Sequence, residues 1–140
     1  MTAVYHGEVV DLVECVRLTQ LPERTTMEES VVWRNGMEKW VLLVEVNCTD
    51  EKRISDFDTW YDTIHIPDIL AGSPGFRSAT RYMLKYPVPG KGKYLAVYEI
   101  ETENIDETME AHRKNVQEKY ALGRNFDHSE IVSRRLCKVT

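Results

Sequence analysis

The order in which strand and helix patterns follow one another after residue 38 most restricts the folds open to this chain. Residues 40–47 (WVLLVEVN) are β-branched and apolar, which is typical of a buried strand. Apolar side chains then recur at helical spacing over residues 51–64, and residues 72–75 (GSPG) end that segment. Residues 76–84 alternate again, so a helix is expected between two strands.

The same order continues in the second half of the chain. A loop rich in proline and glycine (residues 87–92) precedes a strand-like run at residues 94–101. Asp106 marks the start of a helix that runs to about Ala121, and residues 128–139 are expected to form a last strand. The resulting order, β-α-β-β-α-β, is that of the ferredoxin-like fold. This is an α+β fold in which a four-stranded antiparallel sheet carries both helices on one face.

Residues 1–37 do not follow this pattern. Apolar side chains between residues 9 and 16 recur at helical spacing, which favours a short amphipathic helix, although part of the same stretch would also suit a strand. Pro22 stops either element. We therefore expect an N-terminal arm (residues 1–37), packed on the main body or on a partner subunit, and one folded domain (residues 38–140).

Composition excludes several classes of protein. The chain carries 23 acidic and 18 basic residues, so it lacks the dense basic face that binding to a nucleic-acid backbone requires. No apolar run approaches the ~20 residues of a membrane-spanning helix. Residues 1–7 lack the basic start and apolar stretch of a signal peptide. Three scattered cysteines form no CxxC pair, which predicts reduced thiols, a cytoplasmic location and neither a disulfide framework nor a structural zinc site.

Both faces of the expected sheet carry apolar side chains. The two helices cover one face, and four strands rich in valine, leucine, isoleucine and tyrosine cannot leave the other face in water. A second copy of the same sheet is the simplest cover. We therefore expect a homodimer in which two sheets pack face to face and form a barrel.

The segment at residues 57–70 carries the strongest candidate for chemistry, His65. It lies four residues after Tyr61, so both side chains share one face of the helix if the helix persists. Pro67 disfavours helical backbone at the residue before it, which predicts that His65 lies near a broken helix C-terminus, where the dipole favours a charged imidazolium. Asp68 is close enough in sequence to accept a hydrogen bond from the ring. Such a histidine can transfer protons near neutral pH; the alternative is a structural hydrogen-bond hub that ends the helix.

Arg81 and three tyrosines are candidates for binding a substrate. Arg81 could form a buried ion pair with Glu99 or Glu45, or its guanidinium could bind a substrate carboxylate or enolate. Strand alternation places Arg81 on the same face as Ala79 but does not tell which face meets the helices. The tyrosines that could donate to a developing oxyanion, or instead belong to the core or an interface, are Tyr61, Tyr82 and Tyr98.

Three further features have less specific interpretations. Residues 89–93 (PGKGK) lack the Walker pattern and are expected to form a hairpin loop, a candidate for a mobile flap over a cavity mouth. Arg134 and Arg135 are expected at a solvated end of the last strand. The remaining histidines make no metal-ligand spacing, so no metal site is expected; they are His6, His112 and His128.

Four segments between residues 39 and 140 resemble the dimeric α/β-barrel superfamily, and most closely its EthD-like branch. They are Trp60-Tyr61-x-x-x-His65-x-Pro67-Asp68, Pro74-Gly75-Phe76, Ser78-Ala79-Thr80-Arg81-Tyr82 and Tyr94-Leu95-Ala96-Val97-Tyr98-Glu99. The superfamily includes polyketide cyclases and dehydratases, muconolactone isomerases, and haem-dependent or cofactor-free monooxygenases. The resemblance implies a ligand cavity between the sheet and its helices, near the end of the first helix, with His65 beside it.

The residues and the resemblance together lead to one expected function. It is an enzyme without a metal or organic cofactor that cyclises, dehydrates or isomerises a small aromatic or polyketide-like substrate. His65 is expected to act as general acid and base, with Asp68 orienting it and Arg81 or a tyrosine holding the enolate. The expected substrate-binding residues are Trp60, Tyr61, Tyr82 and Tyr98. Two alternatives are kept: a haem-binding or oxygen-using relative with His65 as axial ligand or base, and a non-catalytic dimer that binds a hydrophobic metabolite.

Overall fold

A computed structural model describes residues 2–5, 8–11, 15–20 and 36–140 of the chain. Within these residues the main sheet contains five antiparallel strands in the order β3-β5-β6-β4-β7. The strands are β3 (Cys15–Gln20), β4 (Glu38–Cys48), β5 (Phe76–Leu84), β6 (Tyr94–Thr102) and β7 (Ser129–Lys138). A separate two-stranded sheet pairs β1 (Thr2–Tyr5) with β2 (Glu8–Asp11).

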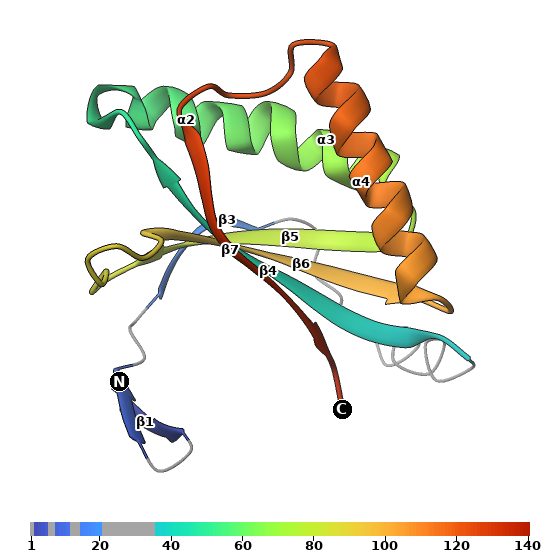
Figure 1. Cartoon of the computed structure of the whole chain (residues 1–140), viewed down its shortest axis with the longest axis horizontal. Helices are drawn as coiled ribbons and strands as arrows, with labels where there is room; N and C mark the ends of the chain where they lie inside the picture. Colours follow the sequence, from blue (N-terminus) through green and yellow to red (C-terminus); the bar gives the residue numbers. More distant parts are fainter. Residues whose placement is uncertain (1, 6–7, 12–14, 21–35) are drawn as a thin grey trace.

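Two helical segments cover one face of the main sheet (Figure 1). The first runs through η1 (Glu51–Arg53), α2 (Ile54–Trp60), η2 (Tyr61–His65) and α3 (Ile66–Gly72). The second is α4 (Ile105–Ala121). The expected α+β class, the antiparallel sheet and the two helices on one face are confirmed, and the arrangement is consistent with a ferredoxin-like fold. No helix in the described part of the chain has both the length and the hydropathy needed to cross a membrane.

The start of α4 differs slightly from expectation. The helix begins at Ile105, and Asn104 rather than Asp106 is its N-cap. The Asn104 side chain accepts a hydrogen bond from the Glu107 amide at 3.2 Å. An asparagine in this position satisfies one of the free amides of the first turn, which is why it ends the preceding loop.

The N-terminal arm differs from expectation more strongly. Residues 8–11 and 15–20 form strands, so the amphipathic helix expected between residues 9 and 16 is wrong. β3 pairs with the edge of β5, with Cys15 opposite Leu84 and Gln20 opposite Thr80. The edge of a sheet offers free backbone donors and acceptors, and a short isolated helix is marginal in water, so pairing prevails over weak helical periodicity. Pro22, expected to stop this element, lies outside the described residues.

The first helical segment does not break before Pro67, contrary to expectation. Ile66 keeps helical backbone angles (φ −62°, ψ −47°), and the segment continues to Gly72. A π-helical turn at η2 accommodates the proline, and in it the Ile66 amide donates to the carbonyl of Tyr61, five residues earlier. Pro67 then falls in the first turn of α3, where its missing N–H costs least. His65 therefore lies inside a continuous helical segment.

The core lies between the helices and one face of the sheet. The strand register puts Ala79 opposite Tyr98 and Tyr98 opposite Leu42, and all three side chains are buried. On the other face, Leu43 and Val97 are also register partners and are only half-buried. The packing of the helices thus assigns each alternating set of strand residues either to the core or to the open face.

Candidate functional site

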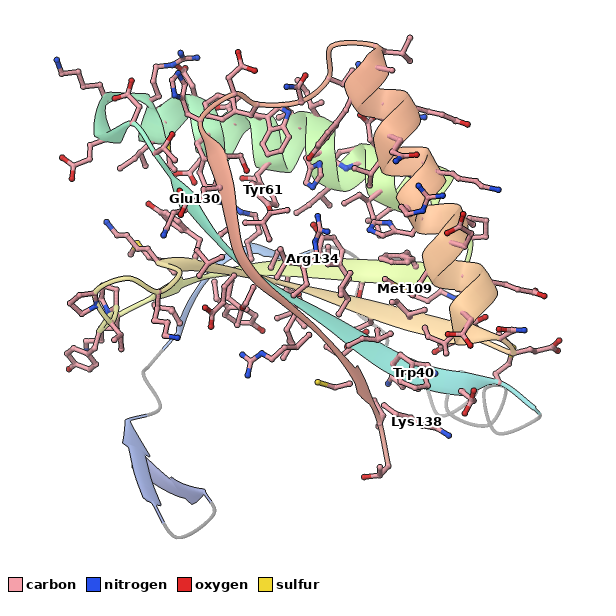
Figure 2. All side chains as sticks on the ribbon, in the orientation of Figure 1. Trp40, Tyr61, Met109, Glu130, Arg134 and Lys138 are labelled. Atoms are coloured by element: carbon pink, nitrogen blue, oxygen red, sulfur yellow. The ribbon has the colours of Figure 1, made fainter. Side chains whose placement is uncertain are left out.

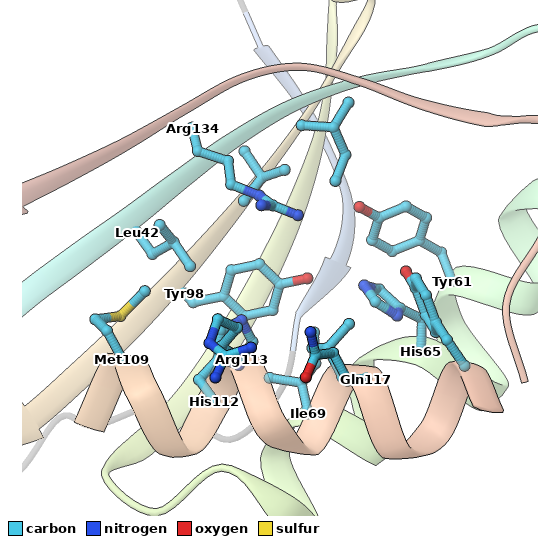
Figure 3. A pocket seen from close by; sticks show the side chains of 14 residues that line it. Leu42, Tyr61, His65, Ile69, Tyr98, Met109, His112, Arg113, Gln117 and Arg134 are labelled. Carbon is cyan, nitrogen blue, oxygen red and sulfur yellow. The ribbon is translucent and has the colours of Figure 1, made fainter. Parts of the chain in front are cut away.

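A cavity of about 440 Å³ lies between the sheet and the helices (Figure 3). Side chains from β4, β6 and β7 line it on the sheet side, and side chains from η2, α3 and α4 line it on the helix side. Its apolar lining residues are Leu42, Val44, Ile69, Met109, Val116 and Ile131. Its polar lining residues are Tyr61, His65, Tyr98, His112, Arg113, Gln117, Tyr120 and Arg134. The cavity therefore combines an apolar interior with several hydrogen-bonding groups.

His65 reaches this cavity from the π-helical turn. Its ring stacks on Trp60 with 4.5 Å between the ring centroids and meets Tyr61 edge-on at 5.0 Å. Burial, and secondarily the nearby His112, lower the pKa of His65 to about 4, although the charge of Asp68 acts in the opposite direction. His65 is therefore neutral at pH 7. The expected charged imidazolium is wrong, because the helix continues past His65 and burial dominates its titration.

Asp68 pairs with Arg124 and not, as expected, with His65. Its carboxylate accepts hydrogen bonds from Nε and Nη2 of Arg124 at 2.7 Å and 3.0 Å. Among the described residues no hydrogen bond joins Asp68 to His65. The backbone carbonyl of Arg124 in turn accepts from the indole Nε1 of Trp60 at 2.8 Å. Asp68 and Trp60 thus hold the chain that follows α4 against the first helical segment, and neither lines the cavity.

Arg81 is buried under the first helical segment and does not line the cavity. Its guanidinium donates to Asp58 at 2.8 Å and to Asp62 at 3.0 Å. The expected pairing with Glu99 or Glu45 is wrong, because the register places both glutamates on the opposite face of the sheet. Arg81 is thus matched by two carboxylates of this chain, and the enolate-binding role expected of it finds no support in its position.

Two of the four expected substrate-binding residues line the cavity, namely Tyr61 and Tyr98. Burial raises the pKa of both phenols, so both stay protonated at neutral pH. The guanidinium of Arg81 lies over the Tyr61 ring, 4.7 Å from its centroid. Trp60 packs in the core, and Tyr82 projects from the open face of the sheet opposite Leu95.

A second histidine, which the spacing of histidines in the sequence did not single out, lines the cavity from α4. His112 Nδ1 lies 2.9 Å from the Ser73 hydroxyl, and its ring stacks on Phe76 at 4.5 Å. Asn115 donates to the same Ser73 oxygen at 3.0 Å. Burial, assisted by the charge of Arg134, lowers the pKa of His112 to about 4. The available signal was the helical spacing of Met109, His112, Val116 and Tyr120, which predicts a packed face but not a cavity beside it.

Arg134 is not simply part of a solvated strand end. Its side chain extends from β7 into the space between the sheet and the helices (Figures 2 and 3). Arg135 points to the open face, where its guanidinium lies 3.7 Å from Glu45. The signal that could have found this difference is strand alternation, because neighbouring residues of a strand point to opposite faces. The expected exposure describes Arg135 correctly and misses the role of Arg134 as a lining residue.

The loop at residues 85–93 does not cover the cavity. The Lys93 amide donates to Oδ1 of Asn47 at 2.7 Å, and Nδ2 of Asn47 donates to the Lys91 carbonyl at 3.2 Å. These bonds hold the loop against the end of β4, and none of its residues lines the cavity. The expected flap is therefore wrong for this cavity.

The residues available for a metal or cofactor are few. Among the described residues no group of three or more His, Cys, Asp or Glu side chains could hold a metal ion. His65 and His112 are the two imidazoles of the wall that could serve as an axial ligand to a haem. Comparison with protein-family models, curated proteins and solved structures gave no match. The function is therefore argued from the cavity and its side chains.

Proposed function

We propose that this protein is an enzyme that moves a proton on a small aromatic or polyketide-like molecule held in the cavity, with His65 as the general base. The observation that supports it is a neutral imidazole in the wall of a cavity of about 440 Å³, beside two protonated phenols. Cavities of this size accommodate small organic ligands. A neutral imidazole accepts a proton, and a phenol donates a hydrogen bond to an oxygen that becomes negative.

The proposed reaction starts at a ligand carbon next to a carbonyl group. His65 takes a proton from this carbon, the C–H electron pair moves toward the carbonyl oxygen, and an enolate forms. Tyr61 and Tyr98 both line the cavity and are protonated, so the hydroxyl of either can donate a hydrogen bond to the enolate oxygen. The His65 imidazolium then returns the proton to another carbon in an isomerisation. In a dehydration or a dehydrative cyclisation it returns the proton to a hydroxyl group that leaves as water.

Burial of His65 ensures that the ring is unprotonated when the ligand binds, although it also makes the imidazole a weaker base. The low pKa keeps the ring in its base form at neutral pH. An enolate that forms beside the ring raises the pKa of His65, because a nearby negative charge stabilises the imidazolium. The negative charge that stabilises the imidazolium thus comes from the ligand itself, whereas the carboxylate of Asp68, expected to orient the ring, pairs with Arg124.

A homodimer remains part of the proposal. The face of the sheet away from the helices carries several half-buried apolar side chains, among them Val41, Leu43, Leu95 and Val97. A second copy of the chain on this face would bury them. The cavity of each copy lies on the other face and would stay accessible.

The test is hydrogen exchange into a ligand that has weakly acidic C–H bonds. Wild-type protein should accelerate exchange of the α-protons of 2-tetralone in D₂O above the buffer rate, as followed by proton NMR. His65→Gln removes the base and should reduce the protein-dependent rate by ~10²–10⁴-fold, with little change in the Kd for 2-tetralone. His128→Gln changes a histidine that does not line the cavity, so it should exchange at the wild-type rate.

Equal exchange rates for wild type and His65→Gln would overturn general-base catalysis by His65. If 2-tetralone still bound with the same affinity to both proteins, the cavity would be a binding site without this chemistry. That outcome would favour the non-catalytic alternative.

A further inference from the structure

We infer that the ligand of this cavity is a small apolar molecule that carries a carboxylate, and that Arg134 binds this carboxylate at the cavity mouth. The inference names the substrate class of the proposed function and rests on it. It is argued from the charges of the wall, from the surroundings of Arg134 and from the position of the mouth.

The charges of the cavity wall are unbalanced. Within the described residues the wall contains two arginines and no Asp or Glu. Arg113 is paired on its own helix with Glu110, which accepts hydrogen bonds from Nε at 2.9 Å and from Nη2 at 2.5 Å. Arg134 has no carboxylate within ion-pair distance in the described part of the chain. Arg134 is therefore the unmatched positive charge of the cavity.

The titratable groups around Arg134 do not supply a counter-charge. Its positive charge acts on Tyr61, His65, His112 and Tyr120; it adds to the lowering of the two histidine pKa values and partly opposes the rise that burial causes in the two tyrosine pKa values. At neutral pH the two imidazoles are neutral and the two phenols protonated, and burial is the largest cause for all four. A ligand that carries an anion would supply this missing counter-charge, and a carboxylate matches the two parallel N–H donors of a guanidinium.

Because Arg134 lies at the rim of the cavity, an ion pair formed there loses only part of its hydration. Tyr120 and Ile131 line the cavity and are 38% and 43% exposed, so they mark its mouth together with Arg134, which is also exposed. A carboxylate bound there keeps part of its hydration, which limits the cost of desolvation. The apolar body of the ligand would lie further in, against residues such as Leu42 and Val116.

Arg135 provides a matched control in the same strand. Arg135 lies next to Arg134 in sequence and points to the other face of the sheet. Its register partner is Leu43 on β4, and it does not line the cavity. Neutralising either arginine changes the net charge of the protein by the same amount. Only the loss of Arg134 removes a charge from the cavity.

The experiment uses two probes of nearly equal shape, 2-naphthoate and 2-naphthamide, which differ in charge. Titration calorimetry at neutral pH gives each Kd, and the NMR resonances of the His65 ring report whether the cavity is occupied. Wild type should bind 2-naphthoate more tightly than 2-naphthamide. Arg134→Gln should weaken 2-naphthoate binding by about ten- to hundredfold and leave 2-naphthamide binding unchanged. Arg134→Lys should lie between, and Arg135→Gln should match wild type.

Three results would overturn the inference. Equal weakening of 2-naphthoate by Arg134→Gln and Arg135→Gln would mean that the probe responds only to overall charge. Equal affinity of wild type for both probes, with the His65 resonances shifted by each, would remove the carboxylate site and leave the proposed function intact. Binding of neither probe would also remove the carboxylate site, and exchange of 2-tetralone would then decide the proposed function separately.

Discussion

Burial controls the charge of the two histidines that face the cavity. His65 and His112 both have a pKa of about 4, and in both cases the largest cause is removal of the ring from water. For His65, the second ring adds repulsion between two imidazolium charges. The two rings are therefore available as neutral hydrogen-bonding groups at physiological pH. Protonating them in the folded protein at lower pH is unfavourable and reduces the free energy of unfolding.

These lowered pKa values predict a loss of stability in mild acid. The unfolded chain protonates the two rings near pH 6.5, whereas the folded chain protonates them only near pH 4. The unfolded state thus binds more protons in this window, so the free energy of unfolding should be constant above about pH 7 and fall as the pH decreases toward 4. For His65 the loss by about pH 5 is ~2 kcal/mol. Urea unfolding of wild type at about pH 7.5 and about pH 5 measures it.

His65→Gln separates this effect from the titration of other groups. The variant should lose the His65 part of the pH dependence, whereas His128→Gln should keep it. Carboxylates titrate mainly below this window and affect both variants alike. An equal pH dependence in wild type and His65→Gln would contradict a neutral His65 in the folded protein.

At the scale of elements, a single arginine fastens the first helical segment to the sheet. Arg81 on β5 pairs with Asp58 on α2 and with Asp62 on η2. The arginine side chain is only 2% exposed, whereas the two carboxylates are 42% and 37% exposed. The same guanidinium lies over the ring of Tyr61, so this cluster also positions part of the cavity wall.

The difference in exposure predicts which half of this cluster is costlier to remove. Asp58→Asn combined with Asp62→Asn leaves Arg81 as a buried, uncompensated charge and should destabilise the fold by ~3–5 kcal/mol. Arg81→Met leaves two carboxylates that water can solvate, and should cost only ~1–2 kcal/mol. Urea unfolding at neutral pH compares the variants.

The exposed pair between Arg53 and Asp56, at 2.7 Å, supplies the control for this comparison. Asp56→Asn should change the free energy of unfolding by less than ~0.5 kcal/mol, because exposed ion pairs contribute little. The prediction would be contradicted if Arg81→Met lost more stability than the double aspartate variant. Burial of the unpaired arginine would then not be the main cost of breaking the cluster.

At the scale of the whole molecule, helices cover one face of the sheet, and no helix of the described residues covers the other, which we call the open face. The helices and the cavity occupy the covered face (Figure 1). The open face presents half-buried apolar side chains such as Leu43, Leu95 and Val97. Apolar surface of this kind is reduced when two copies associate through the same face, which is the symmetric solution for a homodimer.

The apolar side chains of the open face predict that the protein is a dimer, and that a charged side chain introduced on this face dissociates it. Val97→Lys places an ammonium group in the proposed interface, so it should sediment as a monomer at about 20 µM, where wild type should be a dimer, without loss of secondary structure by circular dichroism. Leu122→Lys introduces the same charge at a side chain that is 73% exposed after α4, and should leave the dimer intact. A wild-type monomer at about 100 µM would contradict the face-to-face arrangement.

The sequence by itself determined the order of strands and helices in residues 38–140. Strands and helices repeat their side chains every 2 and 3.6 residues, so apolar spacing within one segment is enough to identify its type. The same local spacing placed Tyr61 and His65 on one helix face, and both residues line the cavity. Spacing was insufficient in the arm, where residues 15–20 pair with β5, because the partner edge lies far away in the sequence.

Only the tertiary structure decided which side chains meet around the site. Alternation tells that Arg134 and Arg135 point to opposite faces, but the packing of α4 and the first helical segment decides which face encloses a cavity. The partners of Arg81 come from a helix that crosses its strand, and no pattern within β5 identifies them. The neutral state of His65 likewise depends on burial, which is a property of the assembled core and not of the segment that carries the ring.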